Sequence, residues 1–193
     1  MYFNNLPKKN HEFGQFSFNL LENIPNIGSM KIGLISDTHG YLDPRVMHHF
    51  EKCDEIWHAG DIGENEVLAQ LQAFKPTQAV FGNIDTPKLQ KELPEFLIME
   101  NGGVKTLMIH IGGRLGRYAK GVKDLIKEHQ PKLFICGHSH ILKVMMDKDL
   151  NVLYMNPGAA GRHGFHQMRT LLRFDLEQGQ IHNLEVIELG KRA

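Results

Sequence analysis

The sequence predicts an α/β domain whose core contains two mixed β-sheets. From Met30 onward, short apolar runs alternate with amphipathic stretches, which is typical of βαβ units in a layered domain. Two hairpin signals in the carboxyl half add antiparallel strands, so a purely parallel sheet is not expected. The 193 residues have the length of one domain, and no repeat or Pro/Gly/Ser linker divides them.

The expected strands are short apolar runs bounded by polar or glycine-containing segments. They cover residues 31–36, 55–58, 78–81, 105–109, 133–136 and 152–155. Three helices are expected between them. The first begins at Asp43-Pro44, which supplies a cap and a first-turn proline, and ends near Cys53. The other two have apolar residues at helical spacing and cover residues 64–74 and 118–129.

The two hairpin signals are turn sequences between apolar runs. Asn101-Gly102-Gly103 separates residues 96–100 from 105–110. Residues 177–180, which read Glu-Gln-Gly-Gln, separate 170–176 from 182–189. Glycine and asparagine at these positions favour tight connections between antiparallel strands.

Residues 1–29 differ from the rest of the chain because they contain Asn, Pro and Phe without a clear period. We interpret them as an N-terminal extension without predicted order, apart from a candidate short helix over residues 18–24. The domain itself is expected to cover residues 30–193.

Five apolar runs end in residues that commonly bind metals. A side chain just beyond the carboxyl end of a strand projects into the crevice where open α/β sheets build their sites. Each group also has an ordinary interpretation, as a helix cap, a turn dipeptide or a strand-end histidine. All five would have to be ordinary at once, so we expect a centre for more than one metal ion. The groups are Asp37-Thr38-His39, Gly60-Asp61, Gly82-Asn83, His110 and Gly137-His138-Ser139-His140.

Composition narrows the function classes. The 22 basic and 22 acidic side chains cancel, so a nucleic acid polymer is not favoured as a partner. Cys53 and Cys136 are too few for a disulfide framework and fit a reducing compartment. No run approaches the roughly 18 apolar residues of a membrane span, and no secretory signal is recognised. We therefore expect a cytoplasmic protein without a membrane partner.

The order of these groups resembles that of the calcineurin-like metallophosphoesterases, in particular the small bacterial and archaeal phosphodiesterase branch. The family pattern reads D-x-H, G-D, G-N-x-D, a lone histidine and G-H-x-H, and this chain matches it from Met30 to about Gly161. Asn156-Pro157-Gly158 also looks like the family's segment after G-H-x-H. The resemblance implies a four-layer α/β-β/α sandwich with two stacked mixed β-sheets.

The resemblance also implies two divalent metal ions. One would be bound by Asp37, His39, Asp61 and His140, and the other by Asp61, Asn83, His110 and His138, with Asp61 bridging. Oxygen and imidazole ligands without thiolate suit manganese, iron or zinc in expanded coordination. They do not suit a tetrahedral structural zinc site. Manganese is our first expectation, with iron, nickel and zinc as alternatives.

The expected activity is hydrolysis of a small phosphate ester, with a diester as the first expectation, by a metal-bridging hydroxide. One departure concerns the proton donor, because Ile84 occupies the position where many related phosphatases have histidine. We therefore assign no catalytic side chain. Five residues are candidates for phosphate contacts or the proton, with surface solvation as the alternative for each: Arg114, Arg117, Arg162, His163 and His166. His58 is a candidate to orient a ligand.

Two other functions are considered. One is a non-catalytic, metal-binding scaffold for protein interactions on the same fold, since a retromer subunit similar to these enzymes works in that way. The complete set of seven ligand positions favours catalysis. The other is a metal-dependent amidohydrolase, but those enzymes place H-x-H on the first strand of a barrel of about 250 residues. A homo-oligomer is compatible with the sequence.

Overall fold

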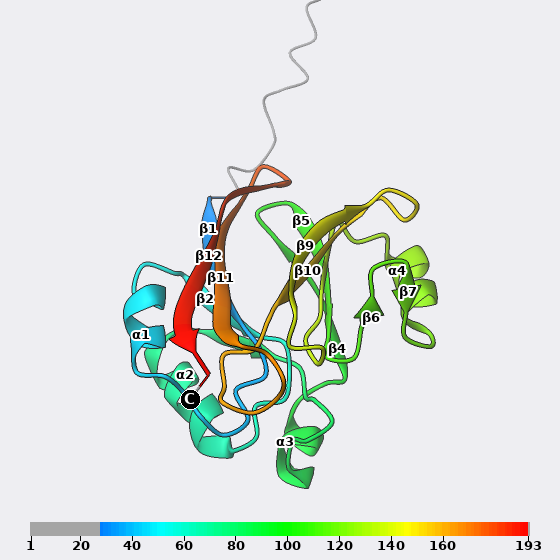
Figure 1. Ribbon diagram of the computed structural model, residues 1–193. Helices are drawn as coiled ribbons and strands as arrows, with labels where there is room; N and C mark the ends of the chain where they lie inside the picture. The colour runs from blue at the N-terminus through cyan, green and yellow to red at the C-terminus, as the bar shows by residue number, and fades with distance from the viewer. Residues whose placement is uncertain (1–27, 193) are drawn as a thin grey trace, which may run out of the picture.

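Two five-stranded mixed sheets form the centre of the protein. The structure is a computed structural model and describes residues 28–192, so the extension predicted for residues 1–29, including its candidate helix, lies almost entirely outside the described residues. Figure 1 shows the two sheets facing each other, with α1 and α2 against one outer face and α4 against the other. The two mixed sheets and the four-layer arrangement predicted for this chain are confirmed.

The first sheet has the strand order β12-β11-β1-β2-β3. Strands β1, β2 and β3 run parallel, and β11 and β12 continue the sheet in antiparallel pairs. Its members are β1 (Met30–Ile35), β2 (Glu55–His58), β3 (Thr77–Ala79), β11 (Met168–Glu177) and β12 (Gln180–Lys191).

The second sheet has the order β4-β5-β8-β10-β9. Its three central strands are parallel, and the outer strands pair antiparallel with them. The strands are β4 (Phe96–Asn101), β5 (Val104–Ile109), β8 (Leu133–Ile135), β9 (Leu142–Asp147) and β10 (Val152–Pro157). Because the parallel strands of each sheet share one direction, their carboxyl ends meet at one edge.

The helices are α1 (Arg45–Phe50), α2 (Asn65–Phe74), α3 (Pro87–Glu92) and α4 (Val122–His129). Three clusters of buried residues correspond to the three interfaces between the layers. Phe50 of α1 and Leu71 of α2 pack on the first sheet, and Ile126 of α4 packs on the second. Between the sheets, Trp57 and Phe174 lie in the same buried cluster as residues of β5, β8 and β10. This burial of apolar side chains between layers stabilises the fold.

The structure differs from the predicted elements in several places. Helix α1 ends at Phe50, earlier than the predicted end near Cys53. Strand β9 was not predicted because it is an edge strand whose Met145 and Met146 are exposed, so it lacks a regular apolar alternation. Helix α3 was also not predicted. It is a single short helix that begins where Thr86 Oγ1 accepts a hydrogen bond from Leu89 N. Helix α4 begins at Val122, after a small hairpin of β6 (Gly113–Arg114) and β7 (Arg117–Tyr118).

Within residues 28–192, no helix combines the length and the apolar character that a bilayer crossing requires.

Candidate metal centre

Side chains from four loops at the carboxyl ends of β1, β2, β5 and β8 converge between the sheets. Six of the seven predicted ligands form two groups in which the candidate ligand atoms all lie within 4.8 Å of one another. The first group is Asp37, His39, Asp61 and His140, and the second is Asp61, His110 and His138. Asp61 belongs to both groups. The structure therefore brings together residues that are up to 103 positions apart, as the pair Asp37 and His140 shows.

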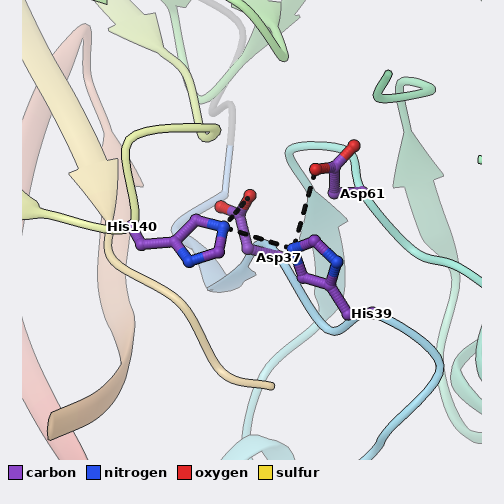
Figure 2. A group of neighbouring side chains, drawn as sticks. All are labelled: Asp37, His39, Asp61 and His140. Atoms are coloured by element: carbon purple, nitrogen blue, oxygen red, sulfur yellow. Dashed lines mark hydrogen bonds and ion pairs between the residues drawn. The ribbon is translucent and has the colours of Figure 1, made fainter. Parts of the chain in front are cut away.

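The first group is a tight cluster of two carboxylates and two imidazoles, drawn in Figure 2. Nε2 of His140 lies 3.2 Å from Oδ1 of Asp37, and Nε2 of His39 lies 3.7 Å from Oδ2 of Asp61. The two Nε2 atoms are themselves 3.2 Å apart. Both carboxylates are buried, whereas the imidazoles are partly exposed, so the cluster is reached from one side.

The second group is organised around His110. Its Nδ1 lies 2.8 Å from the carbonyl oxygen of Ala59, which can only accept a hydrogen bond, so Nδ1 carries a proton. Its Nε2 faces Asp61, 3.1 Å from Oδ1. The ring of His138 packs edge-on against His110 with centroids 5.3 Å apart. The hydrogen bond to Ala59 thus directs the metal-binding nitrogen of His110 toward Asp61.

The donor chemistry of this centre fits divalent metal ions. Nε2 of His110 is buried and forms no well-oriented hydrogen bond with the described residues. In the neutral tautomer set by Ala59, this nitrogen presents a lone pair to the carboxylate of Asp61. Lone pairs that face each other in a buried site are unfavourable unless a proton or a cation lies between them. The residues present therefore fit the metal ions that the resemblance implies.

The pKa of His110 shows how the space between its Nε2 and the Asp61 carboxylate responds to a proton. Burial lowers the pKa of His110, but a protonated Nε2 gains a hydrogen bond to Asp61 and the attraction of its charge, so the pKa of His110 is above the ordinary value of 6.5. Burial would raise the pKa of Asp61, yet His110 and the N–H of Ile84 keep that pKa below its usual value. Positive charge between the two side chains is therefore stabilising. The pKa of His39, a partly exposed ligand of the first group, is instead lowered by burial.

The backbone around the centre is held in an unusual conformation. Nine non-glycine residues of the described chain have positive φ angles, and five of them are candidate ligands. Such conformations are uncommon outside glycine and persist where the surrounding structure enforces them. Their concentration here indicates that ligand placement takes precedence over backbone preference. The five are Asp37, His39, Asp61, His138 and His140.

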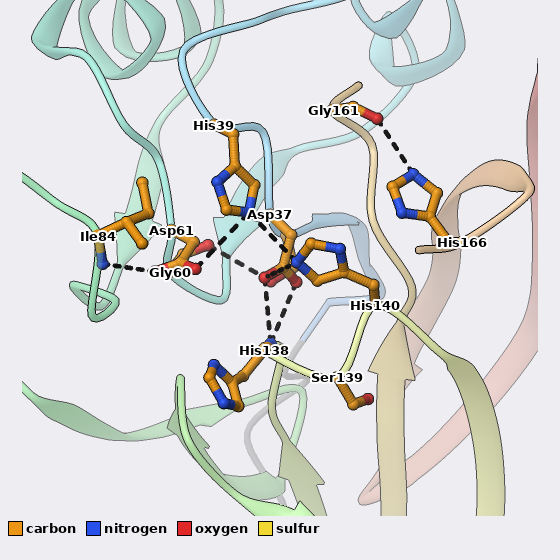
Figure 3. A network of polar contacts seen from close by, with 12 residues as sticks. Asp37, His39, Gly60, Asp61, Ile84, His138, Ser139, His140, Gly161 and His166 are labelled. Carbon is orange, nitrogen blue, oxygen red and sulfur yellow. Dashed lines mark hydrogen bonds and ion pairs between the residues drawn. The ribbon is translucent and has the colours of Figure 1, made fainter. Parts of the chain in front are cut away.

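The Gly137-His138 segment lies directly against Asp37. The N–H of His138 donates to both carboxylate oxygens of Asp37, at 3.2 Å each, as Figure 3 shows. A side chain at Gly137 would overlap Oγ of Ser36 and lie 2.9 Å from Oδ2 of Asp37. Asn156 supports the same segment, because its Nδ2 donates to the carbonyl of Gly137 at 2.7 Å. Glycine is required here by the close approach of two chain segments.

His58 is fully buried and joins the loops after β1 and β2. Its Nδ1 accepts from the N–H of Gly60 at 3.2 Å, so the proton of the neutral ring is on Nε2. Nε2 lies 3.0 Å from Oγ1 of Thr38, and that hydroxyl donates to the carbonyl of Ile62. Burial lowers the pKa of His58 to about 3, which keeps the ring neutral. His58 therefore contacts Thr38 and the backbone of Gly60, which are chain neighbours of candidate ligands, and its orienting role remains a prediction. The sequence pattern did not indicate the contact with Thr38.

The Gly82–Asp85 segment lies beside Asp61. The N–H of Ile84 donates to Oδ1 of Asp61 at 3.1 Å. Asp85 is buried and accepts from the N–H groups of Gly63 and Gly82, at 2.6 and 2.7 Å, so it ties this loop to the loop after β2. Asn83, the seventh predicted ligand, is exposed and lines a pocket that also contains His110. The structure therefore places Asn83 in the lining of the same pocket as His110, a member of the second group.

The five residues predicted as candidates for phosphate contacts or for the proton donor occupy different positions. Arg162 donates to the hydroxyl of Tyr41, and its guanidinium lies 3.9 Å from that ring's centroid, so Arg162 has a structural partner. His163 lies edge-on to His39, and His166 lies edge-on to His140, with centroids 5.7 and 5.2 Å apart. Arg114 and Arg117 are paired across the β6–β7 hairpin.

Curated relatives with similar sequences are archaeal. A protein named probable metallophosphoesterase from Methanocaldococcus jannaschii is 34% identical over 141 residues, which cover 68% of this chain and 69% of the relative. A protein of the same name from Methanothermobacter thermautotrophicus is 29% identical over 139 residues, covering 67% of this chain and 77% of that protein.

Solved structures with the same fold include an archaeal phosphodiesterase and Vps29. The archaeal phosphodiesterase superposes with a TM-score of 0.66 at 24% identity, over 82% of this chain and all of its own. Vps29 from Chaetomium thermophilum gives a TM-score of 0.66 at 15% identity, over 85% of this chain and all of its own. Residues 30–179 match the model of the calcineurin-like phosphoesterase superfamily domain. The chain therefore belongs to the calcineurin-like phosphoesterase superfamily and is a metal-dependent phosphoesterase.

Proposed function

We propose that this protein is a dinuclear phosphodiesterase that hydrolyses small phosphate diesters. The observation that carries this proposal is that the Asp61 carboxylate belongs to both groups of candidate ligand atoms. A shared carboxylate between two donor groups is the arrangement expected for two neighbouring cations that act on one phosphate.

In this proposal the first metal is held by Asp37, His39, Asp61 and His140, and the second by Asp61, His110 and His138 with Asn83 from the pocket wall. When bound, divalent ions supply positive charge for a phosphate ester and activate water at neutral pH. Oxygen and imidazole donors without thiolate support manganese as the first choice, and iron, nickel and zinc suit the same donors.

The side chains around the centre support a diester with a good leaving group. Ile84 is 43% exposed beside Asp61 and cannot donate a proton. General acid catalysis is typically worth about 10²- to 10⁴-fold in rate. A substrate whose leaving oxygen departs without a proton, such as an aryloxide, is therefore favoured. The backbone N–H groups of His138 and Ile84 donate to Asp37 and Asp61, and the N–H of Ile84 helps to keep the pKa of Asp61 below its usual value.

Charge and cysteine content support the remaining parts of the proposal. The formal net charge of zero favours a small phosphate ester over a nucleic acid polymer as the partner. Cys53 and Cys136 are free and buried, which fits a cytoplasmic location. A homo-oligomer is compatible with this proposal and is not required by it, because both donor groups come from one chain.

A scaffold without catalytic activity is the second candidate. Its support is the fold shared with Vps29 and the exposed apolar side chains Met145 and Met146 on the edge strand β9. The convergence of six candidate ligands favours catalysis. Burying carboxylates beside imidazoles costs free energy unless a cation lies between them, and a scaffold has no need of that arrangement.

The test uses metal-free protein reconstituted separately with manganese, nickel, zinc and magnesium. Each form is assayed on bis(p-nitrophenyl) phosphate and on p-nitrophenyl phosphate, and metal content is measured in parallel. We expect two ions per chain, highest activity with manganese, and faster turnover of the diester. Equal or faster turnover of the monoester would contradict the diesterase assignment, and metal-loaded protein without any turnover would favour the scaffold.

A further inference from the structure

A groove beside the metal centre contains two cationic side chains that have no acidic partner among residues 28–192. Arg114, on the β6–β7 hairpin, and Lys143, on β9, line one pocket of about 290 Å³ together with Ser139 and Ile141. A neighbouring pocket of about 270 Å³ shares Arg114, Ser139 and Ile141 and reaches His138. The two pockets therefore form one groove that leads from a candidate metal ligand to the two cations.

The charges of this groove are unbalanced. No aspartate or glutamate lines either pocket. Among residues 28–192, neither Arg114 nor Lys143 lies within 4 Å of a carboxylate. Arg114 is exposed, and Lys143 is half-buried. Two unpaired cations in one groove are the charge complement of an anion.

Ser139 adds a directed donor to the same groove. Its Oγ accepts from Asn156 Nδ2 at 3.2 Å and from Ile141 N at 3.4 Å. Both of its acceptor positions are therefore used, and its O–H is free to donate. Figure 3 shows the Ser139 hydroxyl directed away from Asp37 and from the rings of its neighbours His138 and His140. Because Ser139 lines both pockets, a hydroxyl donor so placed can bind an anionic oxygen in the groove.

The hairpin that carries Arg114 is held in place from the core. The hydroxyl of Tyr154 donates to the carbonyl of Gly113 at 3.0 Å and accepts from Sγ of Cys136 at the same distance. The hydroxyl of Tyr118 donates to Asp147, which ties the hairpin to the end of β9. The two elements that bear Arg114 and Lys143 are thereby fixed relative to each other, which is the preorganisation that an anion site needs.

We propose that this groove binds a second anionic group of the substrate, so that the preferred substrate is a phosphate ester that carries another phosphate or carboxylate. The scissile phosphate occupies the metal centre, and the second anion contacts Arg114, Lys143 and the Ser139 hydroxyl. Ile141 and Leu115 cover the connecting part of the substrate. This inference rests on the proposed function, because it requires the metal centre to bind the first phosphate.

The test measures binding of non-hydrolysable ligands to manganese-loaded protein by calorimetry. Alkylphosphonates of two to five carbons bear one anionic group. Phosphonocarboxylates and alkylene bisphosphonates of the same lengths bear a second one, and these two series distinguish a carboxylate from a phosphate. We expect at least one ligand with a second anion to bind about tenfold more tightly than the alkylphosphonate of its length.

The variants Arg114→Gln and Lys143→Met should remove this tenfold gain and leave the affinity for alkylphosphonates within about twofold. The matched controls are Arg117→Gln, on the same hairpin but outside the groove lining, and Lys148→Met, just beyond β9. Both controls should keep the gain. An equal loss in the controls would show a general effect of positive charge and would overturn the proposal.

Two other outcomes separate this inference from the proposed function. If alkylphosphonates bind but a second anion adds no affinity at any length, the groove assignment is wrong and the metal centre stands. If protein that holds two metal ions binds neither series, both the groove and the proposed function are wrong.

Discussion

Nε2 of His39 and Nε2 of His140 lie 3.2 Å apart, although the two residues are separated by 101 positions in the sequence. Asp37 and Asp61 lie against the same two nitrogens. If both rings are neutral, Nε2–H of one ring can donate to Nε2 of the other. That hydrogen bond leaves both carboxylates without a nearby positive charge. A divalent ion would satisfy all four side chains together.

Metal should therefore stabilise the folded protein through these two histidines. With free manganese at about a hundred times its dissociation constant, we expect the free energy of unfolding to rise by about 3 kcal/mol. His39→Ala and His140→Ala should each lose most of this increment. Thermal unfolding with manganese and with a chelator measures the effect. The control is His182→Ala on β12, where the side chain is exposed, and an increment unchanged in the first two variants would contradict their role as ligands.

Asp61→Asn should remove the shared carboxylate with little change in volume. We expect turnover of the aryl diester to fall by about 10³-fold, because both donor groups lose their common charge. Metal content per chain, measured in the same samples, should also fall. Asp124→Asn, at an exposed position of α4, changes net charge equally and should have no effect. Retained activity and two retained ions in Asp61→Asn would refute Asp61 as the bridge.

His58 predicts a pH-dependent stability. Its pKa is about 3 in the folded protein, against an ordinary value of 6.5. Below pH 6.5 the unfolded chain therefore binds a proton at this ring that the folded protein does not, so the stabilising contribution is complete above pH 6.5 and is lost as the pH falls toward 3. The shift corresponds to roughly 4–5 kcal/mol over that range.

The measurement is urea unfolding of metal-free protein between pH 7.5 and pH 4. His58→Gln keeps a polar side chain but cannot titrate, so its free energy of unfolding should fall less steeply with decreasing pH than that of the parent. His182→Gln, at an exposed site, should follow the parent. Identical slopes for the parent and His58→Gln would show that the buried ring does not govern this dependence.

Gly137→Ala tests the close packing behind the centre. The added methyl would overlap Ser36 and press on the Asp37 carboxylate. We expect a loss of about 1–3 kcal/mol in stability from overpacking, and at least a tenfold loss of metal affinity because Asp37 must move. Gly28→Ala is the matched control, since no atom of the described part of the chain lies within 4 Å of its added methyl. Unaltered metal affinity in Gly137→Ala would mean that the ligand loop adapts freely.

Much of the fold follows from local pattern. The central strands β1, β2, β5, β8 and β10 were predicted to within two residues at either end, because buried parallel strands form continuous apolar runs. The elements that were missed are β9, α3 and the β6–β7 hairpin, which are short or half-exposed. Their formation depends on pairing with neighbours, and no periodic pattern in the sequence records such pairing.

The sequence by itself determined which side chains follow the strands and therefore which ligand chemistry is available. The reason is that the local spacing of apolar residues sets the alternation of strand, loop and helix. Tertiary structure alone decided that Asp61 lies between two donor groups, that Ala59 sets the tautomer of His110, and that Arg114 and Lys143 face one groove. These relationships join loops from different strands. They depend on the order of strands in the sheets and on the contact between sheets, which are set by the packing of the whole core.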